Sequence, residues 1–243
     1  IFRKYKFQYI KDKCIPIGIE LDNIQIEQLI KFYEMMIETN KVMNLTGITD
    51  FDEFVEKHFL DSLSLCKAYS EISKNRFVID LGTGAGFPGI PLAIMYKNTR
   101  FVLLDSLDKR IKFINEVISS LSIRNVETIS GRAEDYAKDM LYREQFDLCV
   151  TRAVAKINLL SEYTLPFVKV GGVCIPYKSS QIEDELEEGK NAIKILGGEL
   201  DKVVNVRIPD TDYDRSLVLI NKVEPTPDKY PRKAGTPKKK PLR

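Results

Sequence analysis

The feature that most constrains this chain is an apolar run that ends in an acid and then breaks into alternating glycines. The run Val78-Ile79-Asp80-Leu81 is followed by Gly82-Thr83-Gly84-Ala85-Gly86-Phe87-Pro88-Gly89. Glycines let a backbone bend sharply and approach a ligand without a Cβ clash, and proline suits the first turn of a helix. This strand–turn–helix pattern predicts a nucleotide-binding turn.

A second apolar run, Phe101-Val102-Leu103-Leu104-Asp105, also ends in an acid. It follows the glycine turn by about 20 residues, where dinucleotide-binding domains place the acid that holds ribose hydroxyls. Asp105 is therefore predicted to bind the ribose of a nucleoside ligand.

The alternation of apolar runs with helical patterns predicts an α/β fold. Strands are expected at 76–81, 101–105, 126–130, 146–151 and 172–177, with helices between them at 88–96, 108–121, 134–141 and 157–166. Such alternation is typical of a parallel sheet covered by helices. A helix at 182–196, ended by two glycines, and an antiparallel pair of strands near 200–208 and 216–222 complete a mostly parallel, seven-stranded sheet.

Three segments are expected along the chain. Residues 1–70 form an N-terminal helical segment: 1–22 are weakly patterned, a helix from Ile24 to Ile37 is capped by Asp22 or Asn23, and Asp50 caps a second helix. Residues 71–223 form the α/β domain. Residues 224–243 are rich in proline and lysine and are interpreted as a tail rather than core.

Composition limits the class of protein and its partners. With 243 residues, 44% hydrophobic and 30% charged, the chain is expected to be globular, soluble and cytoplasmic. No apolar run approaches the ~18 residues of a membrane span. The four cysteines form no CxxC and there is one histidine, so reduced thiols and no metal site are expected. From Thr226 onward the chain contains seven basic residues and one acid, which suggests a polyanionic partner.

Two cofactors compete for the glycine turn. Gly84 to Gly89 matches the GxGxxG spacing of NAD(P)-dependent oxidoreductases, which stay an alternative. The acid Asp80, the long segment before the turn and the prolines at the helix start favour S-adenosylmethionine, which has no phosphate. Asp80 would then face the ammonium or sulfonium side of S-adenosylmethionine, and the glycines would lie against its methionine part. Ala133 and Glu134 are expected beside adenine, although Glu134 equally suits a helix N-terminus.

The loop after the fourth strand limits which methylation reactions are possible. Its sequence is Arg152-Ala153-Val154-Ala155. It lacks the Asp/Asn-Pro-Pro-aromatic motif of enzymes that methylate exocyclic amines. Cys149 lies in an apolar strand with no preceding proline, so a packed thiol is favoured over a nucleophile. A nitrogen with a free lone pair, such as guanine N7, needs no general base and depends on in-line positioning. Arg152 is a candidate to hold the methionine carboxylate or guanine O6.

Blocks throughout the chain resemble one family, the bacterial small-subunit ribosomal RNA guanine-N7 methyltransferases, also called glucose-inhibited division protein B. The blocks are Asn44 to Thr46, Lys57 to Ser62, Asp80 to Pro91, Leu104 to Arg110, Gly131 to Glu134, Thr151 to Ala155 and Tyr230 to Pro237. The resemblance implies a Rossmann-like class I methyltransferase fold. It implies methyl transfer from S-adenosylmethionine to guanine N7 in 16S rRNA, with S-adenosylhomocysteine as product.

The resemblance also implies site residues. It implies cofactor contacts at Gly82, Phe87, Asp105, Ser106, Leu107, Ala133, Glu134 and Arg152, to which the pattern of the turn itself adds Asp80, Gly84 and Gly86. The candidates for substrate positioning are Asn44, Arg152, Lys178 and Arg215. Asn44 either caps a turn or faces the guanine, and Lys178 and Arg215 either meet RNA phosphate or are solvated. Thr39 departs from the family, which usually has an aromatic residue there.

Further expectations concern the partner and the remaining polar residues. The basic residues Arg232, Lys233, Lys238 and Lys239 are predicted to contact RNA phosphate, in a monomer that binds 16S rRNA or the small ribosomal subunit. His58 is expected to be partly buried and hydrogen-bonded, and Asp61 to cap the helix that follows it. A non-catalytic RNA-binding factor stays a further alternative.

Overall fold

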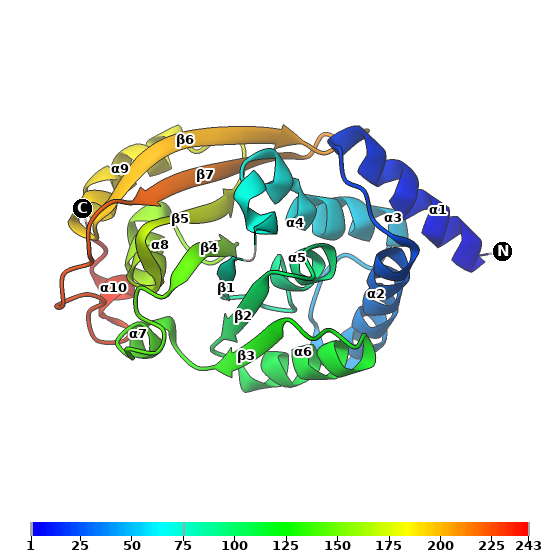
Figure 1. Ribbon diagram of the computed structural model, residues 1–243, viewed down its shortest axis with the longest axis horizontal. Helices are drawn as coiled ribbons and strands as arrows, with labels where there is room; N and C mark the ends of the chain where they lie inside the picture. The colour runs from blue at the N-terminus through cyan, green and yellow to red at the C-terminus, as the bar shows by residue number, and fades with distance from the viewer. Residues whose placement is uncertain (1, 75, 243) are drawn as a thin grey trace.

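The computed structural model describes residues 2–74 and 76–242, and within them it confirms the seven-stranded sheet (Figure 1). The strands are β1 (Phe77–Leu81), β2 (Arg100–Asp105), β3 (Val126–Ser130), β4 (Phe146–Arg152), β5 (Val168–Lys178), β6 (Gly198–Arg207) and β7 (Asp214–Lys222). Their order is β3-β2-β1-β4-β5-β7-β6, and β7 runs antiparallel to both of its neighbours. The order reverses between β1 and β4, which is where open α/β sheets bind ligands.

Helices cover both faces of the sheet (Figure 1). In the α/β region they are α5 (Gly89–Met95), α6 (Asp108–Ser120), α7 (Ala133–Tyr136), α8 (Ile157–Thr164), the short 3-10 turn η5 (Leu165–Phe167) and α9 (Glu183–Ile195). Successive strand side chains point to opposite faces, so Val78 joins one core with α5 and α6, while Ile79 joins a second with α8 and α9. Both faces are buried, which explains the continuous apolar runs.

The N-terminal residues form a longer set of helices than the sequence predicts. They are α1 (Phe2–Cys14), η1 (Ile15–Ile17), α2 (Asn23–Met43), α3 (Phe51–Phe54), η2 (Val55–Leu60), α4 (Asp61–Leu63), η3 (Ser64–Lys67) and η4 (Ser70–Ser73). Asp22 caps α2 in a reciprocal capping box, and Asp50 caps α3, both as expected. Helix α1 has no counterpart among the expected elements.

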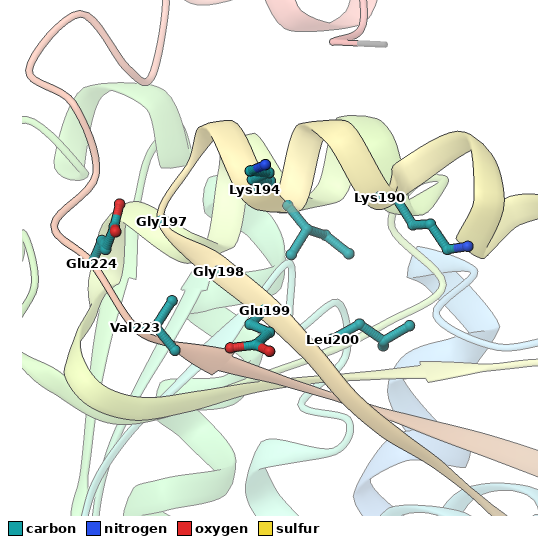
Figure 2. Close-up of a pocket in the computed structure, with 9 residues that line it drawn as sticks. Lys190, Lys194, Gly197, Gly198, Glu199, Leu200, Val223 and Glu224 are labelled. Carbon is teal, nitrogen blue, oxygen red and sulfur yellow. The ribbon is translucent and has the colours of Figure 1, made fainter.

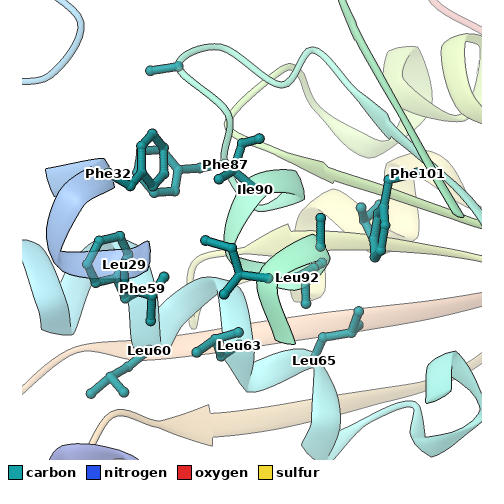
Figure 3. Close-up of a cluster of buried hydrophobic side chains, with 14 of the residues drawn as sticks. Leu29, Phe32, Phe59, Leu60, Leu63, Leu65, Phe87, Ile90, Leu92 and Phe101 are labelled. Atoms are coloured by element: carbon teal, nitrogen blue, oxygen red, sulfur yellow. The ribbon is translucent and has the colours of Figure 1, made fainter. Parts of the chain in front are cut away.

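An aromatic cluster joins these helices to the glycine turn (Figure 3). The rings of Phe32 and Phe87 lie 5.2 Å apart, and those of Phe54 and Phe87 5.9 Å apart. Phe32 comes from α2, Phe54 from α3, and Phe87 from the turn itself. The N-terminal helices therefore share a core with the sheet and fix the position of the turn.

The C-terminal segment packs against the domain, which corrects the expectation that residues 224–243 lie outside the core. Thr226, Tyr230 and Pro237 are buried, and the segment contains a short helix, α10 (Thr236–Lys239). Arg143 donates hydrogen bonds to the carbonyl oxygens of Thr226 and Tyr230, at 2.8 Å each. Across residues 2–74 and 76–242, no helix is both long and apolar enough to cross a membrane.

Candidate functional site

The glycine turn has a backbone shape that requires glycine at three positions. The φ angles of Gly82, Gly84 and Gly86 are +70°, +62° and +103°. A Cβ atom at Gly82 would lie 2.6 Å from Val154 Cγ2, whereas a Cβ atom at Gly84 would meet nothing within 4 Å. The turn is therefore closely packed at Gly82 and open at Gly84, so a ligand can approach the backbone there.

Asp80 fastens the turn from inside. Its carboxylate is fully buried, and Oδ2 accepts hydrogen bonds from Thr83 Oγ1 (2.6 Å) and the Gly89 N–H (2.8 Å). Its other oxygen, Oδ1, has no partner among the described residues. Burial raises the pKa of Asp80 to about 7, although these two hydrogen bonds and Arg152 oppose the increase. Its predicted contact with the cofactor stays a prediction, because Asp80 lines neither of the two cavities described below.

Asp105 holds the turn from the neighbouring strand. Its Oδ2 accepts a hydrogen bond from the Gly84 N–H (2.9 Å), and Oδ1 accepts one from the Leu107 N–H (2.9 Å). Arg110 Nη1 lies 3.4 Å from Oδ2. One buried carboxylate thus ties the open part of the glycine turn to the loop after β2.

A cavity of about 560 Å³, here called the glycine-turn cavity, opens beside these two loops. Its lining residues are Leu81, Gly82, Leu104, Asp105, Ser106, Leu107, Arg110, Gly131, Arg132, Ala133, Glu134, Ala153, Val154 and Tyr163. It brings together six predicted cofactor residues, namely Gly82, Asp105, Ser106, Leu107, Ala133 and Glu134. Sequence reasoning missed Tyr163, because nothing in the spacing of α8 distinguishes it from an ordinary amphipathic position.

A second cavity, of about 510 Å³, lies beyond the end of β4 and is here called the arginine cavity. It is lined by Ile48, Lys57, His58, Arg152, Ala153, Tyr177, Lys178, Ser179, Glu185, Tyr213 and Arg215. Ala153 lines both cavities and has a φ of +57°, an uncommon conformation for a residue other than glycine. The two cavities therefore share a lining residue in a strained conformation, and such residues tend to cluster at functional sites.

Asp61 organises the arginine cavity. Its carboxylate is fully buried and accepts hydrogen bonds from Arg152 Nη1 (2.6 Å), Arg215 Nε (2.6 Å) and Arg215 Nη2 (3.0 Å). The expectation that Asp61 caps a helix is wrong. Arg215 is buried against this carboxylate, so the expectation of a solvated or phosphate-bound side chain does not describe it either. Charge-assisted pairs of this kind are rigid, and they fix both guanidinium groups.

His58 is partly buried and fully hydrogen-bonded, as expected. Arg152 Nη2 lies 3.2 Å from Nδ1, and Thr46 Oγ1 lies 2.9 Å from Nε2. Because an arginine can only donate, Nδ1 is the acceptor and the proton lies on Nε2. Burial and the charge of Arg152 lower the pKa of His58 to about 3, so the ring is neutral. Phe87 stacks on this ring at 4.6 Å and supports it without lining either cavity.

The other two predicted substrate residues, Asn44 and Lys178, differ in their surroundings, since Asn44 is exposed whereas Lys178 is paired within the fold. Asn44 ends helix α2 in the left-handed conformation, with φ +48°, and lines neither cavity. Lys178 lies in the arginine cavity, but its Nζ donates to the Ala155 carbonyl oxygen (2.8 Å) and pairs with Glu185 (2.5 Å). Its charge is thus balanced by the protein, contrary to the expectation of a solvated or phosphate-bound side chain.

The predicted RNA-contacting residues divide into two groups. Lys233, Lys238 and Lys239 are exposed. Arg232 instead forms an ion pair with Glu162, whose side chain is fully buried, at 2.6 Å between Nη2 and Oε2. The lysines are available to a partner, while Arg232 is committed to the interior.

A further cavity, of about 380 Å³, lies between α9 and the start of β6 (Figure 2). Lys190 and Lys194 come from the helix, and Glu199 and Leu200 from the strand. It shares no lining residue with the glycine-turn or arginine cavities, and it contains none of the predicted site residues.

Comparison with known families decides between the two cofactor hypotheses. Residues 25–218 match the family described as rRNA small subunit methyltransferase G. The chain belongs to this family. It is 50% identical over 226 residues to ribosomal RNA small subunit methyltransferase G of Lachnoclostridium phytofermentans, covering 93% of each chain. It is 44% identical over 237 residues to the protein of that name from Clostridium tetani, covering 98% of this chain and 99% of that one.

Solved structures with a similar fold confirm the predicted methyltransferase architecture. A SAM-dependent methyltransferase from Aquifex aeolicus superposes with a TM-score of 0.53 at 18% identity, covering 70% of this chain and 93% of that one. A mutant of MtNAS in complex with S-adenosylmethionine gives a TM-score of 0.54 at 18% identity, covering 80% of this chain and 76% of that one. At this identity the likeness concerns the fold alone.

Proposed function

We propose that this chain transfers the methyl group of S-adenosylmethionine to N7 of a guanine in 16S rRNA. The observation that carries the proposal is that two cavities share the lining residue Ala153. One cavity is lined by Gly82 of the glycine turn and by Asp105 at the end of β2, and the other by Arg152 and Arg215. A methyl donor in the first cavity and a base in the second would approach each other at Ala153, where proximity and alignment promote transfer.

The glycine-turn cavity suits the parts of S-adenosylmethionine. Gly82 lines the cavity, and the neighbouring Gly84 has open space where a Cβ would lie, which fits the methionine part. Asp105 is a buried acceptor for ribose hydroxyls. Glu134 is an acceptor for the exocyclic amine of adenine. The unpartnered Oδ1 of Asp80 lies behind the turn, and a cationic ligand nearby would favour its ionised form.

The arginine cavity suits a reaction that removes no proton. S-adenosylmethionine supplies an electrophilic methyl group on a sulfonium. Formation of the bond from N7 to the methyl carbon breaks the bond from that carbon to sulfur, whose electron pair stays on the sulfur of S-adenosylhomocysteine. The lone pair of neutral His58 lies on Nδ1, which accepts a hydrogen bond from Arg152, so this side chain is not poised as a general base.

The exposed lysines of the C-terminal segment supply the contact with RNA. Lys233, Lys238 and Lys239 are free to neutralise phosphates, so affinity should fall as salt rises, and replacing one lysine should reduce the salt slope by about one. The proposal excludes Arg232 from this role because it is paired with Glu162.

The site is tested by a substitution at the open part of the turn. Gly84→Asp should abolish binding of S-adenosylhomocysteine in calorimetry, because the side chain would occupy the ligand's space and repel Asp105. Gly171→Asp is the matched control, since Gly171 also has a positive φ (+87°) and open space around it but lies at the start of β5. Wild-type heat for Gly84→Asp would refute the site.

The reaction is tested by incubating the protein with labelled S-adenosylmethionine and rRNA from cells that lack it, followed by mapping of the labelled atom. Label at a guanine N7 supports the proposal, and label at any other atom overturns it. A thermal shift with NADH but none with S-adenosylhomocysteine would restore the oxidoreductase alternative. RNA binding without methyl transfer would favour a non-catalytic binding factor.

A further inference from the structure

The C-terminal segment from Tyr230 to Lys240 lies against the outer wall of the glycine-turn cavity. Helix α10 packs on α8, and Figure 1 shows α10 between α7 and α8. The Gly235 N–H donates a hydrogen bond to Glu134 Oε1 at 3.1 Å. Glu134 lines the cavity, so a residue 101 positions away in sequence contacts a group of the predicted donor site.

Arg232 anchors this segment to α8. Its backbone N–H and its Nε donate to Glu162 Oε1 at 2.8 and 2.9 Å, and Nη2 donates to Oε2 at 2.6 Å. Nη2 also donates to the Lys240 carbonyl oxygen at 2.8 Å. Because Glu162 is fully buried and precedes the cavity residue Tyr163, both ends of the segment are fixed relative to the cavity.

Gly235 lies between these two anchor points, in a conformation that suits glycine. Its φ is +84°, and this bend aims its N–H at Glu134. Glu134 is 6% exposed, and only Gly235 donates a hydrogen bond to its carboxylate within residues 2–74 and 76–242. One oxygen is therefore held by the segment, and the other, Oε2, is left for a ligand in the cavity.

We infer that Arg232 and Gly235 are positioning residues that orient Glu134 so that Oε2 accepts a hydrogen bond from the 6-amino group of adenine. The C-terminal segment thereby makes the donor site selective for adenosine over inosine. An inosine base carries an oxygen at position 6, which would face the carboxylate without a shared proton. The inference rests on the proposed function, since it assumes an adenosine donor in this cavity.

The inference is tested by calorimetry of the full chain with S-adenosylhomocysteine and with S-inosylhomocysteine. Wild-type protein should bind the adenosine compound at least about tenfold more tightly, because a hydrogen bond to a charged acceptor is replaced by repulsion. Glu134→Gln should remove most of this ratio, since an amide can donate to the inosine oxygen. Arg232→Met should also reduce the ratio of the two affinities several-fold, because the segment that holds Glu134 loses its anchor.

Lys229→Met is the matched control for Arg232→Met. It removes one positive charge immediately before this segment, and Lys229 contacts the ring of Tyr230 rather than Glu162 or Glu134. The control should keep the wild-type ratio. If Arg232→Met does not fold, Arg232→Lys keeps the charge, loses the two-pronged contact and should give an intermediate ratio.

The outcomes distinguish failure of this inference from failure of the proposed function. Equal binding of both compounds by wild type, or an unchanged ratio in the folded Arg232 variant, overturns the inference while the proposed function stands. Failure of wild type to bind S-adenosylhomocysteine overturns both. A ratio lost in the Glu134 and Arg232 variants but kept in Lys229→Met supports the positioning role, because mere destabilisation would weaken both compounds alike.

Discussion

Replacing Asp61 by asparagine should produce one of the largest losses of stability available from a single isosteric change in this chain. The carboxylate is fully buried and balances two guanidinium groups, whose side chains are 12% (Arg152) and 10% (Arg215) exposed. Asparagine keeps the shape but carries no charge, so two cations would remain in a largely buried site without the carboxylate that balances them.

The magnitude follows from the burial of this cluster. Breaking a buried ion pair by removing one partner costs about 3–5 kcal/mol, because the remaining charge loses its compensation. We expect Asp61→Asn to lower the free energy of unfolding in urea by that amount at neutral pH. For a chain of this length, each kcal/mol corresponds to roughly 2–4 °C in melting temperature, so thermal unfolding should start markedly earlier.

The same substitution at an exposed pair provides the control. Asp212 pairs with Arg207 at 3.4 Å, and both side chains are well exposed. Exposed pairs contribute about 0–1 kcal/mol, so Asp212→Asn should be close to neutral. If Asp61→Asn costs no more than Asp212→Asn, then the buried cluster does not stabilise the fold and the argument for a rigid arginine cavity fails.

Two further predictions concern buried charges elsewhere. Burial raises the pKa of Asp80 to about 7, so the stability that its protonated form contributes is present at low pH and is lost as pH rises toward 7. Relative to wild type, the free energy of unfolding of Asp80→Asn in urea titrations should therefore gain roughly 2–3 kcal/mol between about pH 5 and 7. A difference between the two proteins that does not change with pH would contradict this. Lys222 is fully buried and its Nζ lies 2.8 Å from Glu144, so Lys222→Met should cost about 2–4 kcal/mol in the same assay; a loss below that of Asp212→Asn would contradict it.

Local sequence patterns predicted the seven strands and most of the helices, although α7 ends at Tyr136 rather than near 141 and β5 begins at Val168 rather than near 172. Continuous apolar runs marked the strands because both faces of a central parallel sheet are buried. The acids Asp22 and Asp50 marked helix starts because a side-chain acceptor satisfies N–H groups that the helix leaves free. Helix α1 was missed, since its buried residues include Lys6 and its apolar pattern is weak. Packing against α2, together with the Lys6–Glu34 ion pair, stabilises it.

The glycine turn was also determined locally, because only glycine adopts its three positive φ angles without strain. The place of Asp105 at the end of β2 was also predicted locally, while its contact with a ribose stays a prediction. What the sequence left undecided was the partner of each charged side chain. Lys178 was expected to meet solvent or phosphate, and the fold gives it Glu185 instead.

Only the tertiary structure decided the pairings that shape the site. Asp61 contacts Arg152, 91 positions away in sequence, and Arg215, 154 positions away. The two arginines come together because β4 and β7 flank β5, and the end of β4 lies at the same edge of the sheet as the start of antiparallel β7. Glu162 meets Arg232 across 70 positions once the C-terminal segment folds back on α8. A strand or a helix start depends on neighbours in the chain, whereas a buried charge depends on whichever opposite charge the topology places beside it.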